Sequence, residues 1–421
     1  PYTAHSKRPA NAAARLRDDG GCRRMESGFA ALFPRERGDH TRRRGVMRPG
    51  HPEGRGQVDP PSTERACMVI ADISGYTDYL QGAELDHAHD VISDLMTAIV
   101  TPLQSHFRLN KLEGDAAFLY APPEDIDGSV LLDMVEGSYF AFRSRVRTIE
   151  RATTCTCGAC SLIPTLGLKM VVHHGTLAHQ SVLGLDELAG PDVILVHRLL
   201  KNDVEETTGT QAYALFTEAA VRAAGLEPEL LDMVSLQAEV PDVGPTSAWV
   251  HDLGRAWEKE QARRRVYVDP EDAIFSVEQH ITGVSPGRAW EWMTRPERRM
   301  TYEVGIDRVL EVAGTARRDV GTQTHCVHGE DAISEEVLDW RPPHYVTYKG
   351  TFAGGEPFVL TDEVVETADG VLVRKNFRAT SAGRRADLEL ALDGLMPHIV
   401  RWLPRLSDLL SERSDEDPPT A

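Results

Sequence analysis

The chain has 421 residues, of which 41% are hydrophobic and 26% charged, a composition typical of soluble globular proteins with about two or three domains. Its formal net charge is −19, although residues 1–65 carry 14 Lys and Arg against 8 Asp and Glu. The acidic remainder argues against nucleic acid as a partner, because phosphate contacts need a basic face. No apolar run approaches the roughly 18 residues of a membrane span. The Arg-rich beginning lacks the apolar core of a secretory signal, so we expect a cytoplasmic protein.

Both ends of the chain are predicted to be tails. Residues 1–64 should form a disordered basic tail, since a segment rich in Pro, Gly and Arg cannot bury a core. The first residue is Pro, and one interpretation is that the tail is an over-extended start, with translation beginning at Met25 or Met47. Residues 413–421 are predicted to be a solvated acidic tail. We assign neither tail a function.

Residues 65–223 alternate between strand and helix patterns. Their β-α-β-β-α-β order is typical of an α+β, ferredoxin-like sheet with helices on one face. The expected strands cover residues 67–73, 166–173 and 180–183 together with a hairpin around residue 115, and the expected helices cover residues 83–106, 129–147 and 193–202.

Two acidic residues are placed at strand ends by this pattern. Asp72 follows the apolar strand, and Asp115 lies in the Gly-Asp turn of the hairpin, the strongest local hairpin signal. Carboxylates on neighbouring strands can hold a divalent cation, and Lys111 nearby favours a phosphate ligand. The alternative is a pair of turn or capping carboxylates, because Asp is favoured at turns in any protein.

Four segments in this part carry a family resemblance. They are ADISGYT (71–77), KLEGDAAF (111–118), LKMVVHHG (168–175) and ELAGPDVILVHRLLKN (187–202). In this order and spacing they resemble the class III adenylate/guanylate cyclase homology domain. More narrowly, the chain resembles a divergent cyclase-like family that inserts a CxCxxC segment before the fourth strand.

The resemblance implies a metal site. Asp72 and Asp115 would bind Mg²⁺ or Mn²⁺ with help from the backbone carbonyl of Ile73. The implied mechanism has two Mg²⁺ ions that bridge the triphosphate of a purine nucleotide while the ribose 3′-oxygen attacks the α-phosphorus and releases pyrophosphate. Domains of this class place their sites across a dimer interface, so the resemblance also implies a homodimer.

Three further residues match functional positions of the family. Lys111 and Glu187 would contact the purine, and Arg198 would be the catalytic residue that stabilises the transition state. Solvated surface charges are the alternative for Lys111 and Glu187, and an ion pair across the sheet is the alternative for Arg198. Ile194 replaces an Asn of the family, and no basic phosphate-binding residue is recognisable after Gly209. Weak cyclisation is therefore one reading, and an inactive nucleotide-sensing or dimerisation module is the other.

A second cluster of chemically active side chains is formed by Cys155, Cys157 and Cys160. Three thiols at this spacing can bind one zinc ion, with a fourth ligand from one of the nearby histidines. Reduced loop thiols or a redox pair are the alternatives. The downstream histidines are His173, His174 and His179.

The rest of the chain predicts a different unit. Residues 224–270 should be a connector with a charged linker helix over 249–265. Residues 271–412 then predict a strand, two short helices, a meander of strands and a long amphipathic helix, which resembles the helix-grip fold of the START-like, polyketide-cyclase-like (SRPBCC) superfamily. The resemblance implies an apolar cavity for a small hydrophobic ligand. A weaker alternative places catalysis in this part.

Overall fold

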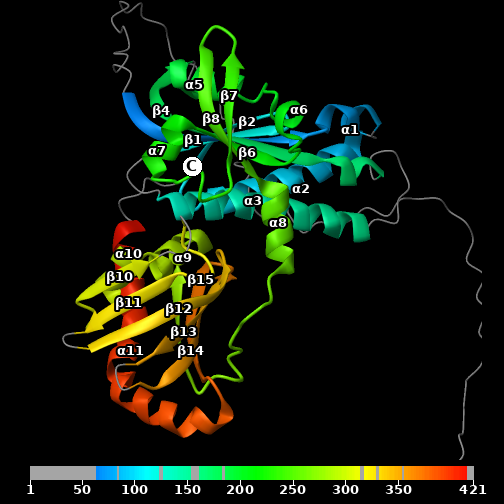
Figure 1. Ribbon diagram of the computed structural model, residues 1–421. Helices are drawn as coiled ribbons and strands as arrows, with labels where there is room; N and C mark the ends of the chain where they lie inside the picture. Colours follow the sequence, from blue (N-terminus) through cyan, green and yellow to red (C-terminus); the bar gives the residue numbers. More distant parts are fainter. Residues whose placement is uncertain are drawn as a thin grey trace, which may run out of the picture. The chain divides into compact units, whose positions relative to one another are not determined.

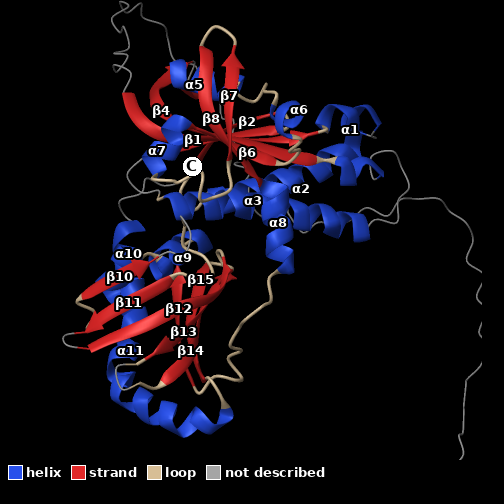
Figure 2. Ribbon diagram, viewed as in Figure 1, coloured by secondary structure: helices blue, strands red, loops and turns tan. Residues whose placement is uncertain are grey.

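The computed structural model describes residues 63–82, 85–122, 127–152, 161–182, 185–312, 317–328, 331–352 and 355–414. All of them fall within one compact unit, Pro60–Ala421. Helices and strands are mixed throughout, which confirms the α+β class (Figures 1 and 2). Among the described residues, no helix combines the length and apolar character that a membrane span requires.

The first sheet belongs to the N-terminal half, which we define as residues 63–262. Its strand order is β2-β3-β1-β4-β6-β8-β7, and β5 pairs with β4. Strands β4 and β6 run parallel, and the other pairs are antiparallel. The strands are β1 (Thr63–Ser74), β2 (Arg108–Glu113), β3 (Ala116–Ala121), β4 (Gly167–Val182), β5 (Leu185–Ala189), β6 (Tyr213–Thr217), β7 (Val234–Val240) and β8 (Gly244–Asp252).

The helices of this half cover the sheet and connect its strands (Figure 2). They are α1 (Tyr76–Gly82), α2 (Leu85–Leu103), α3 (Gly128–Ala152), α5 (Pro191–Arg198), α6 (Val204–Thr208), α7 (Glu218–Ala224) and α8 (Leu253–Ala262).

Strand β1 is central and is buried on both faces. Val69 and Ala71 pack into the core formed with α2 and α3, whereas Met68 and Ile70 pack into a second core with α5. A strand covered on both sides shows a continuous apolar run rather than alternation. Asp72 is the first acidic residue at the end of that run, so the strand delivers a carboxylate to the edge of the core.

Four sequence-based expectations for this half are wrong. The helices expected on one face of the sheet cover both faces, because α2 and α3 pack on one side of β1 and α5 packs on the other. The strand expected to end at residue 173 continues through Gly175 to Val182 as β4. The linker helix expected from residue 249 begins only at Leu253, because Trp249 lies in β8. The expected connector contains β7, which pairs with β8 and extends the first sheet. Its buried residues alternate as in any half-buried strand, but flanking Pro and Glu residues obscured that period.

The C-terminal half, defined here as residues 275–414, holds an antiparallel sheet of order β10-β11-β12-β13-β14-β15-β9. Its last helix supplies apolar residues to both cores of this half. Figure 1 shows this helix bending along its length, and it contains Pro397 and Pro404, which remove backbone donors. The elements are β9 (Phe275–Thr282), α9 (Pro286–Thr294), α10 (Pro296–Tyr302), β10 (Arg308–Val312), β11 (Gln323–His328), β12 (Asp331–Arg341), β13 (Tyr345–Thr351), β14 (Pro357–Thr367), β15 (Gly370–Ala379) and α11 (Arg385–Ser414).

A buried carboxylate on α3 links elements of the two halves. Asp133 accepts hydrogen bonds from the indole N–H groups of Trp290 at 3.4 Å and Trp340 at 3.2 Å, and it pairs with Arg317 at 2.5 Å. Burial raises the pKa of Asp133 to about 7. Arg317 also pairs with Glu136 at 2.8 Å, so its charge is shared between two carboxylates.

Candidate functional site

Asp72 and Asp115 lie at adjoining strand ends, as the sequence predicts. Asp72 lies opposite Ala116 in the last residue pair between β1 and β3, and the backbone N–H of Ile73 donates to the backbone carbonyl of Asp115 at 3.0 Å. The pKa of Asp115 is raised, first by burial and then by the charge of Asp72. A cation placed beside these two negative charges would be stabilised by both of them. Metal binding by the pair stays a prediction.

The number of protein ligands limits the kind of cation. Within the described residues, no group of three or more His, Cys, Asp or Glu side chains is arranged to hold a metal ion. Mg²⁺ keeps several water ligands and is often held by one or two carboxylates plus substrate phosphates. The Asp72–Asp115 pair fits that mode, in which the nucleotide completes the site, better than a cage built only from protein.

Lys169 is a neighbour that the sequence did not reveal. It lies directly across from Asp72 in the β1–β4 register, and its ammonium group is 3.0 Å from the Asp72 carboxylate. Both side chains are largely shielded, with exposed fractions of 26% and 16%. A metal ion would need the carboxylate of Asp72 as a ligand, and Lys169 already places one positive charge beside that carboxylate.

Lys111 and Glu187 are 76 positions apart in the chain and meet on the surface of the first sheet. The Lys111 ammonium lies 3.6 Å from Glu187 on β5 and 2.7 Å from Glu113 on its own strand β2. The hydrogen bond to Glu113 raises the pKa of Lys111. The sequence did not single out Glu113, which also lies 3.3 Å from His197 of α5.

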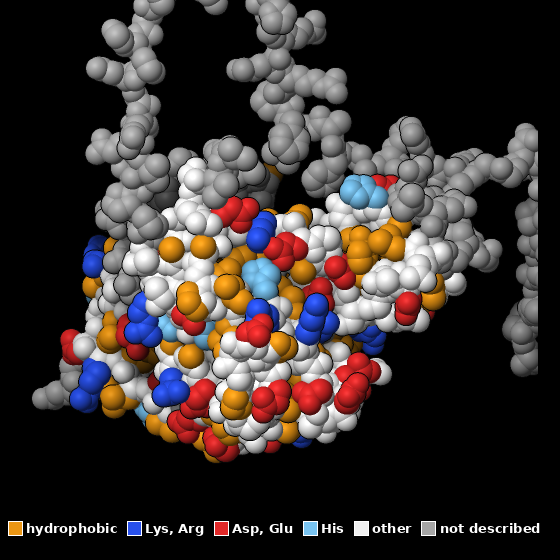
Figure 3. All heavy atoms as spheres, turned by 90° about the horizontal axis from the view of Figure 1, so that it is seen from above, with side chains coloured by type: hydrophobic (Ala, Val, Ile, Leu, Met, Phe, Trp, Pro, Cys, Tyr) orange, Lys and Arg blue, Asp and Glu red, His pale blue; other side chains and the backbone are white. Residues whose placement is uncertain are grey.

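Glu113 is held ionised by its neighbours. Burial acts to raise its pKa, but the hydrogen bond from Lys111 and the charge of His197 outweigh that effect and lower it. The cluster of Lys111, Glu113, Glu187 and His197 thus offers both donors and acceptors at one place. Figure 3 shows the molecule from above the view of Figure 1, where acidic and basic side chains are interspersed with hydrophobic ones.

Arg198 points to a different part of the half. Its guanidinium donates to the Asp242 carboxylate at 2.9 Å and to the Pro241 carbonyl, both in the β7–β8 turn. Ile194, one helical turn earlier on α5, is 52% exposed. The ion pair considered as an alternative for Arg198 is therefore present, with Asp242 as its partner.

The three cysteines of the CxCxxC segment lie outside the described residues. The histidines proposed as a fourth ligand have other partners. His173 contacts Thr217 at 2.9 Å and Asp192 at 3.3 Å, and His179 contacts Glu64 at 2.9 Å. His174 lies 3.4 Å from Arg65, and burial lowers its pKa.

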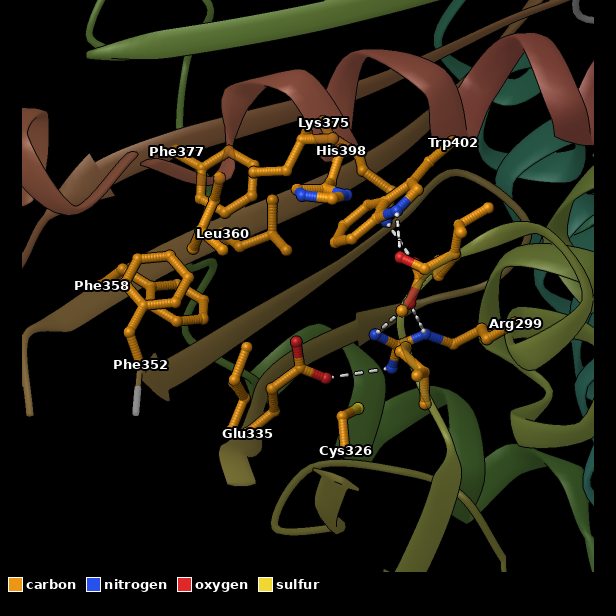
Figure 4. Close-up of a pocket in the computed structure, with 17 residues that line it drawn as sticks. Arg299, Cys326, Glu335, Phe352, Phe358, Leu360, Lys375, Phe377, His398 and Trp402 are labelled. Atoms are coloured by element: carbon orange, nitrogen blue, oxygen red, sulfur yellow. Dashed lines mark hydrogen bonds and ion pairs between the residues drawn. The ribbon is translucent and has the colours of Figure 1, made fainter. Parts of the chain in front are cut away.

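A second candidate site is a cavity of about 250 Å³ in the C-terminal half. Figure 4 shows aromatic and aliphatic side chains from the sheet at one end and charged side chains at the other, with Trp402 and His398 of α11 alongside. The apolar end includes Phe352, Phe358, Leu360 and Phe377, and the charged end includes Arg299, Glu303, Glu335 and Lys375.

The charged end is an internally paired network. Arg299 of α10 contacts Glu303 at 3.1 Å and Glu335 at 3.0 Å. Lys375 contacts Glu303 at 3.0 Å and Asp362 at 2.7 Å. Burial alone would lower the pKa of Lys375, but the adjacent carboxylates raise it. Burying charged groups this deeply costs desolvation free energy unless they are paired, and all of these side chains are paired.

Comparisons with known proteins cover parts of the chain. A family described as a protein of unknown function (DUF2652) matches residues 92–208. The uncharacterised protein Rv2561/Rv2562 of Mycobacterium tuberculosis (strain ATCC 25618 / H37Rv) is 46% identical over 98 residues, which is 23% of this chain and 45% of that protein. The chain thus spans less than half the length of this curated relative.

Solved structures with similarity to the chain include two adenylyl cyclases. A bacterial light-regulated adenylyl cyclase has a TM-score of 0.37 at 10% identity, covering 46% of this chain and 54% of that chain. The adenylyl cyclase CyaB from P. aeruginosa has a TM-score of 0.36 at 15% identity, covering 46% of this chain and 96% of that chain.

Proposed function

We propose that the N-terminal half is a divergent class III nucleotidyl cyclase-like domain that binds a purine nucleoside triphosphate together with Mg²⁺ or Mn²⁺. The observation that carries the proposal is the meeting of Asp72 and Asp115 at adjoining strand ends. The four sequence segments that resemble cyclases, two of which contain these carboxylates, also support it. The same resemblance favours a homodimer as the working form.

Each part of the nucleotide would meet a chemically suitable group. Asp72, Asp115 and the Ile73 carbonyl would hold the cation, which when bound neutralises charge on the triphosphate. Lys111 and Glu187 supply one cationic donor and one anionic acceptor 3.6 Å apart. A purine edge carries both acceptors and donors, so this pair suits a base better than a phosphate.

Turnover is proposed to be weak. Arg198 is occupied by Asp242 and Pro241, and Ile194 offers no polar group beside it. Loss of one preorganised transition-state contact costs on the order of 10²–10³ in rate. The alternative is an inactive nucleotide-sensing or dimerisation module, which the Lys169–Asp72 ion pair favours because it gives the site a cation of its own.

The experiment uses the full chain, Mn²⁺ and either ATP or GTP. We expect nucleotide with Mn²⁺ to raise the melting temperature of the wild type but not of Asp72→Asn or Asp115→Asn. Asp78→Asn is the matched control, because Asp78 is an exposed carboxylate on α1, close to Asp72 in the sequence. Cyclic nucleotide formed by the wild type and lost in Asp72→Asn supports the enzyme; a thermal shift without product supports the sensor. No thermal shift in the wild type rejects both.

The CxCxxC segment is proposed to bind zinc through Cys155, Cys157 and Cys160. The proposal rests on ligand spacing alone. Elemental analysis of the purified chain is expected to give about one zinc per chain for the wild type and less than half of that for Cys157→Ser. Equal zinc content in the two proteins rejects the assignment.

The C-terminal half is proposed to be a helix-grip, START-like domain that binds a small hydrophobic molecule. Support comes from the sequence of elements, in which two short helices follow the first strand and a long helix closes the chain. The cavity between the sheet and α11 is the expected location of the ligand. Its volume of about 250 Å³ is near the lower limit for small-molecule pockets.

A further inference from the structure

We propose that the cavity of the C-terminal half selects a compact, neutral ring compound that carries a hydroxyl group, and that Glu335 accepts the hydrogen bond from this hydroxyl. The inference rests on the proposed ligand-binding function of this half and adds the chemical class of the ligand. It is independent of the proposed nucleotide site.

The apolar end of the cavity is built for a flat ring. Phe352 and Phe358 stack with ring centroids 4.3 Å apart and an interplanar angle of 29°. Phe377 follows at 5.8 Å from Phe358. In Figure 4 these rings lie together at one end, with Leu360 beside them. Aromatic side chains bind other rings by offset stacking or edge contacts as well as by apolar burial.

The volume restricts the size of the ligand. The cavity volume of about 250 Å³ lies near the lower limit of small-molecule pockets. One or two fused rings fit this space. A cavity near the lower limit of small-molecule pockets favours such a compact compound over a long acyl chain.

Glu335 provides the acceptor at the opposite end. Only 6% of this residue is exposed, and its Oε2 accepts from Arg299 at 3.0 Å. Figure 4 shows the other carboxylate oxygen directed toward the space between Arg299 and the aromatic end. A carboxylate held in this way accepts a further hydrogen bond without having to be reoriented.

The charge balance disfavours an ionic ligand. Arg299 is engaged by Glu303 and Glu335, and Lys375 is engaged by Glu303 and Asp362. An anionic ligand would therefore compete with internal carboxylates for donors that are already used. A cationic ligand would have to lose its hydration in an apolar cavity. A neutral hydroxyl avoids both costs and still finds a charged acceptor.

Three probes with the same ring system test the inference: 2-naphthol, naphthalene and 2-naphthoate. In isothermal titration calorimetry of the full chain, we expect 2-naphthol to bind about tenfold or more tightly than either of the other probes. A difference in affinity of about tenfold is what one hydrogen bond to a charged group typically contributes. Equal binding of naphthalene overturns the role of the hydroxyl. Tighter binding of 2-naphthoate overturns the preference for a neutral ligand.

Two pairs of variants locate the effect. Glu335→Gln should reduce the preference for 2-naphthol over naphthalene to about threefold or less, since a neutral amide is a weaker acceptor. Glu336→Gln should keep the full preference, because Glu336 is exposed on the opposite side of β12. Leu395→Trp fills the cavity and should abolish binding of all probes, whereas Leu390→Trp on the same helix, at a 75% exposed position, should not.

The possible failures can be told apart. If no probe binds to the wild type, both the inference and the proposed ligand-binding function of this half are rejected. If naphthalene and 2-naphthol bind equally and Leu395→Trp abolishes both, the cavity binds apolar molecules and only the hydroxyl selection is wrong. If Glu336→Gln and Glu335→Gln change the preference equally, Glu335 is not the acceptor.

Discussion

The ammonium group of Lys169 lies 3.0 Å from the Asp72 carboxylate, directly across the β1–β4 strand pair. The site of the proposed cation therefore contains a positive charge that belongs to the protein. A divalent cation at Asp72 has to share the carboxylate with Lys169 or displace it. The strength of metal binding should accordingly depend on this one residue.

Replacing Lys169 with Met keeps the apolar stem of the side chain and removes its charge. We expect Mn²⁺ to bind about tenfold more tightly to Lys169→Met than to the wild type, because a competing charge on a shielded carboxylate has gone. Titration followed by electron paramagnetic resonance of Mn²⁺ measures this. Lys201→Met, at an exposed position just after α5, is the control and should change nothing. Weaker Mn²⁺ binding in Lys169→Met would mean that Lys169 positions Asp72 instead of competing for it.

The contact between Arg198 and Asp242 predicts that turnover can be raised. Asp242→Asn removes the carboxylate that holds the Arg198 guanidinium, and Asn tolerates the left-handed backbone at this position, where φ is 62°. We expect cyclic nucleotide formation to rise by about fivefold or more if the freed guanidinium stabilises the transition state. Asp232→Asn, also at a positive φ of 56°, is the matched control. An unchanged rate in Asp242→Asn would remove Arg198 from the proposed catalytic set.

Lys111 and Glu187 should behave as one unit in nucleotide binding. Residues in contact show non-additive effects, with coupling free energies of about 0.5–3 kcal/mol. We expect Lys111→Ala and Glu187→Ala each to weaken ATP or GTP binding, and the double variant to be no weaker than the worse single variant. Nucleotide affinities of the wild type, both single variants and the double variant, measured by isothermal titration calorimetry, complete this double-mutant cycle. Fully additive losses would show that the two residues contact different parts of the nucleotide.

Asp133 predicts how stability depends on pH. Its folded pKa of about 7 lies above the ordinary value of 3.8, because burial opposes ionisation. A group with a raised folded pKa stabilises the protein below its unfolded pKa, and this contribution is lost as the pH rises through the folded value. The stability of the wild type relative to Asp133→Asn should thus fall by about 2 kcal/mol between pH 5 and pH 8.

Urea unfolding of the wild type and of Asp133→Asn at pH 5 and pH 8 measures the difference in their free energies of unfolding. The titration of most other groups affects both proteins equally and cancels in this difference. Asp133→Leu is expected to be destabilised by about 3–5 kcal/mol, because it removes one of the two carboxylates paired with Arg317 and the acceptor of two buried indole N–H groups. A pH-independent difference between the wild type and Asp133→Asn would show that Asp133 is ionised throughout this range.

Local signals in the sequence were sufficient for the acidic pair. The Gly-Asp turn fixed the hairpin, and the apolar run before Asp72 fixed a buried strand, so both carboxylates had to lie at strand ends. Lys169 could not be foreseen, because its position opposite Asp72 depends on the register of two strands separated by almost one hundred residues. The partner of Arg198 likewise lies in a turn 44 positions away.

Residue composition gave a wrong expectation for strand β7 and no indication of the buried charges in the C-terminal half. The Pro and Glu residues around β7 suggested a connector, although Leu236, Ala238 and Val240 alternate as in a half-buried strand. In the C-terminal half, Glu335 and Lys375 belong to residue types that are almost always exposed. Their burial follows from mutual pairing between α10, β12, β14 and β15, and pairing of this kind leaves no periodic signal in the sequence.

The most direct test of the account is Mn²⁺ binding by the full chain in the presence of a non-hydrolysable nucleoside triphosphate. Titration should give saturable binding to the wild type, at least a tenfold weaker response for Asp72→Asn and for Asp115→Asn, and no specific binding for the double variant. Undiminished Mn²⁺ affinity in either single variant would contradict the claim that these two carboxylates hold one cation between them.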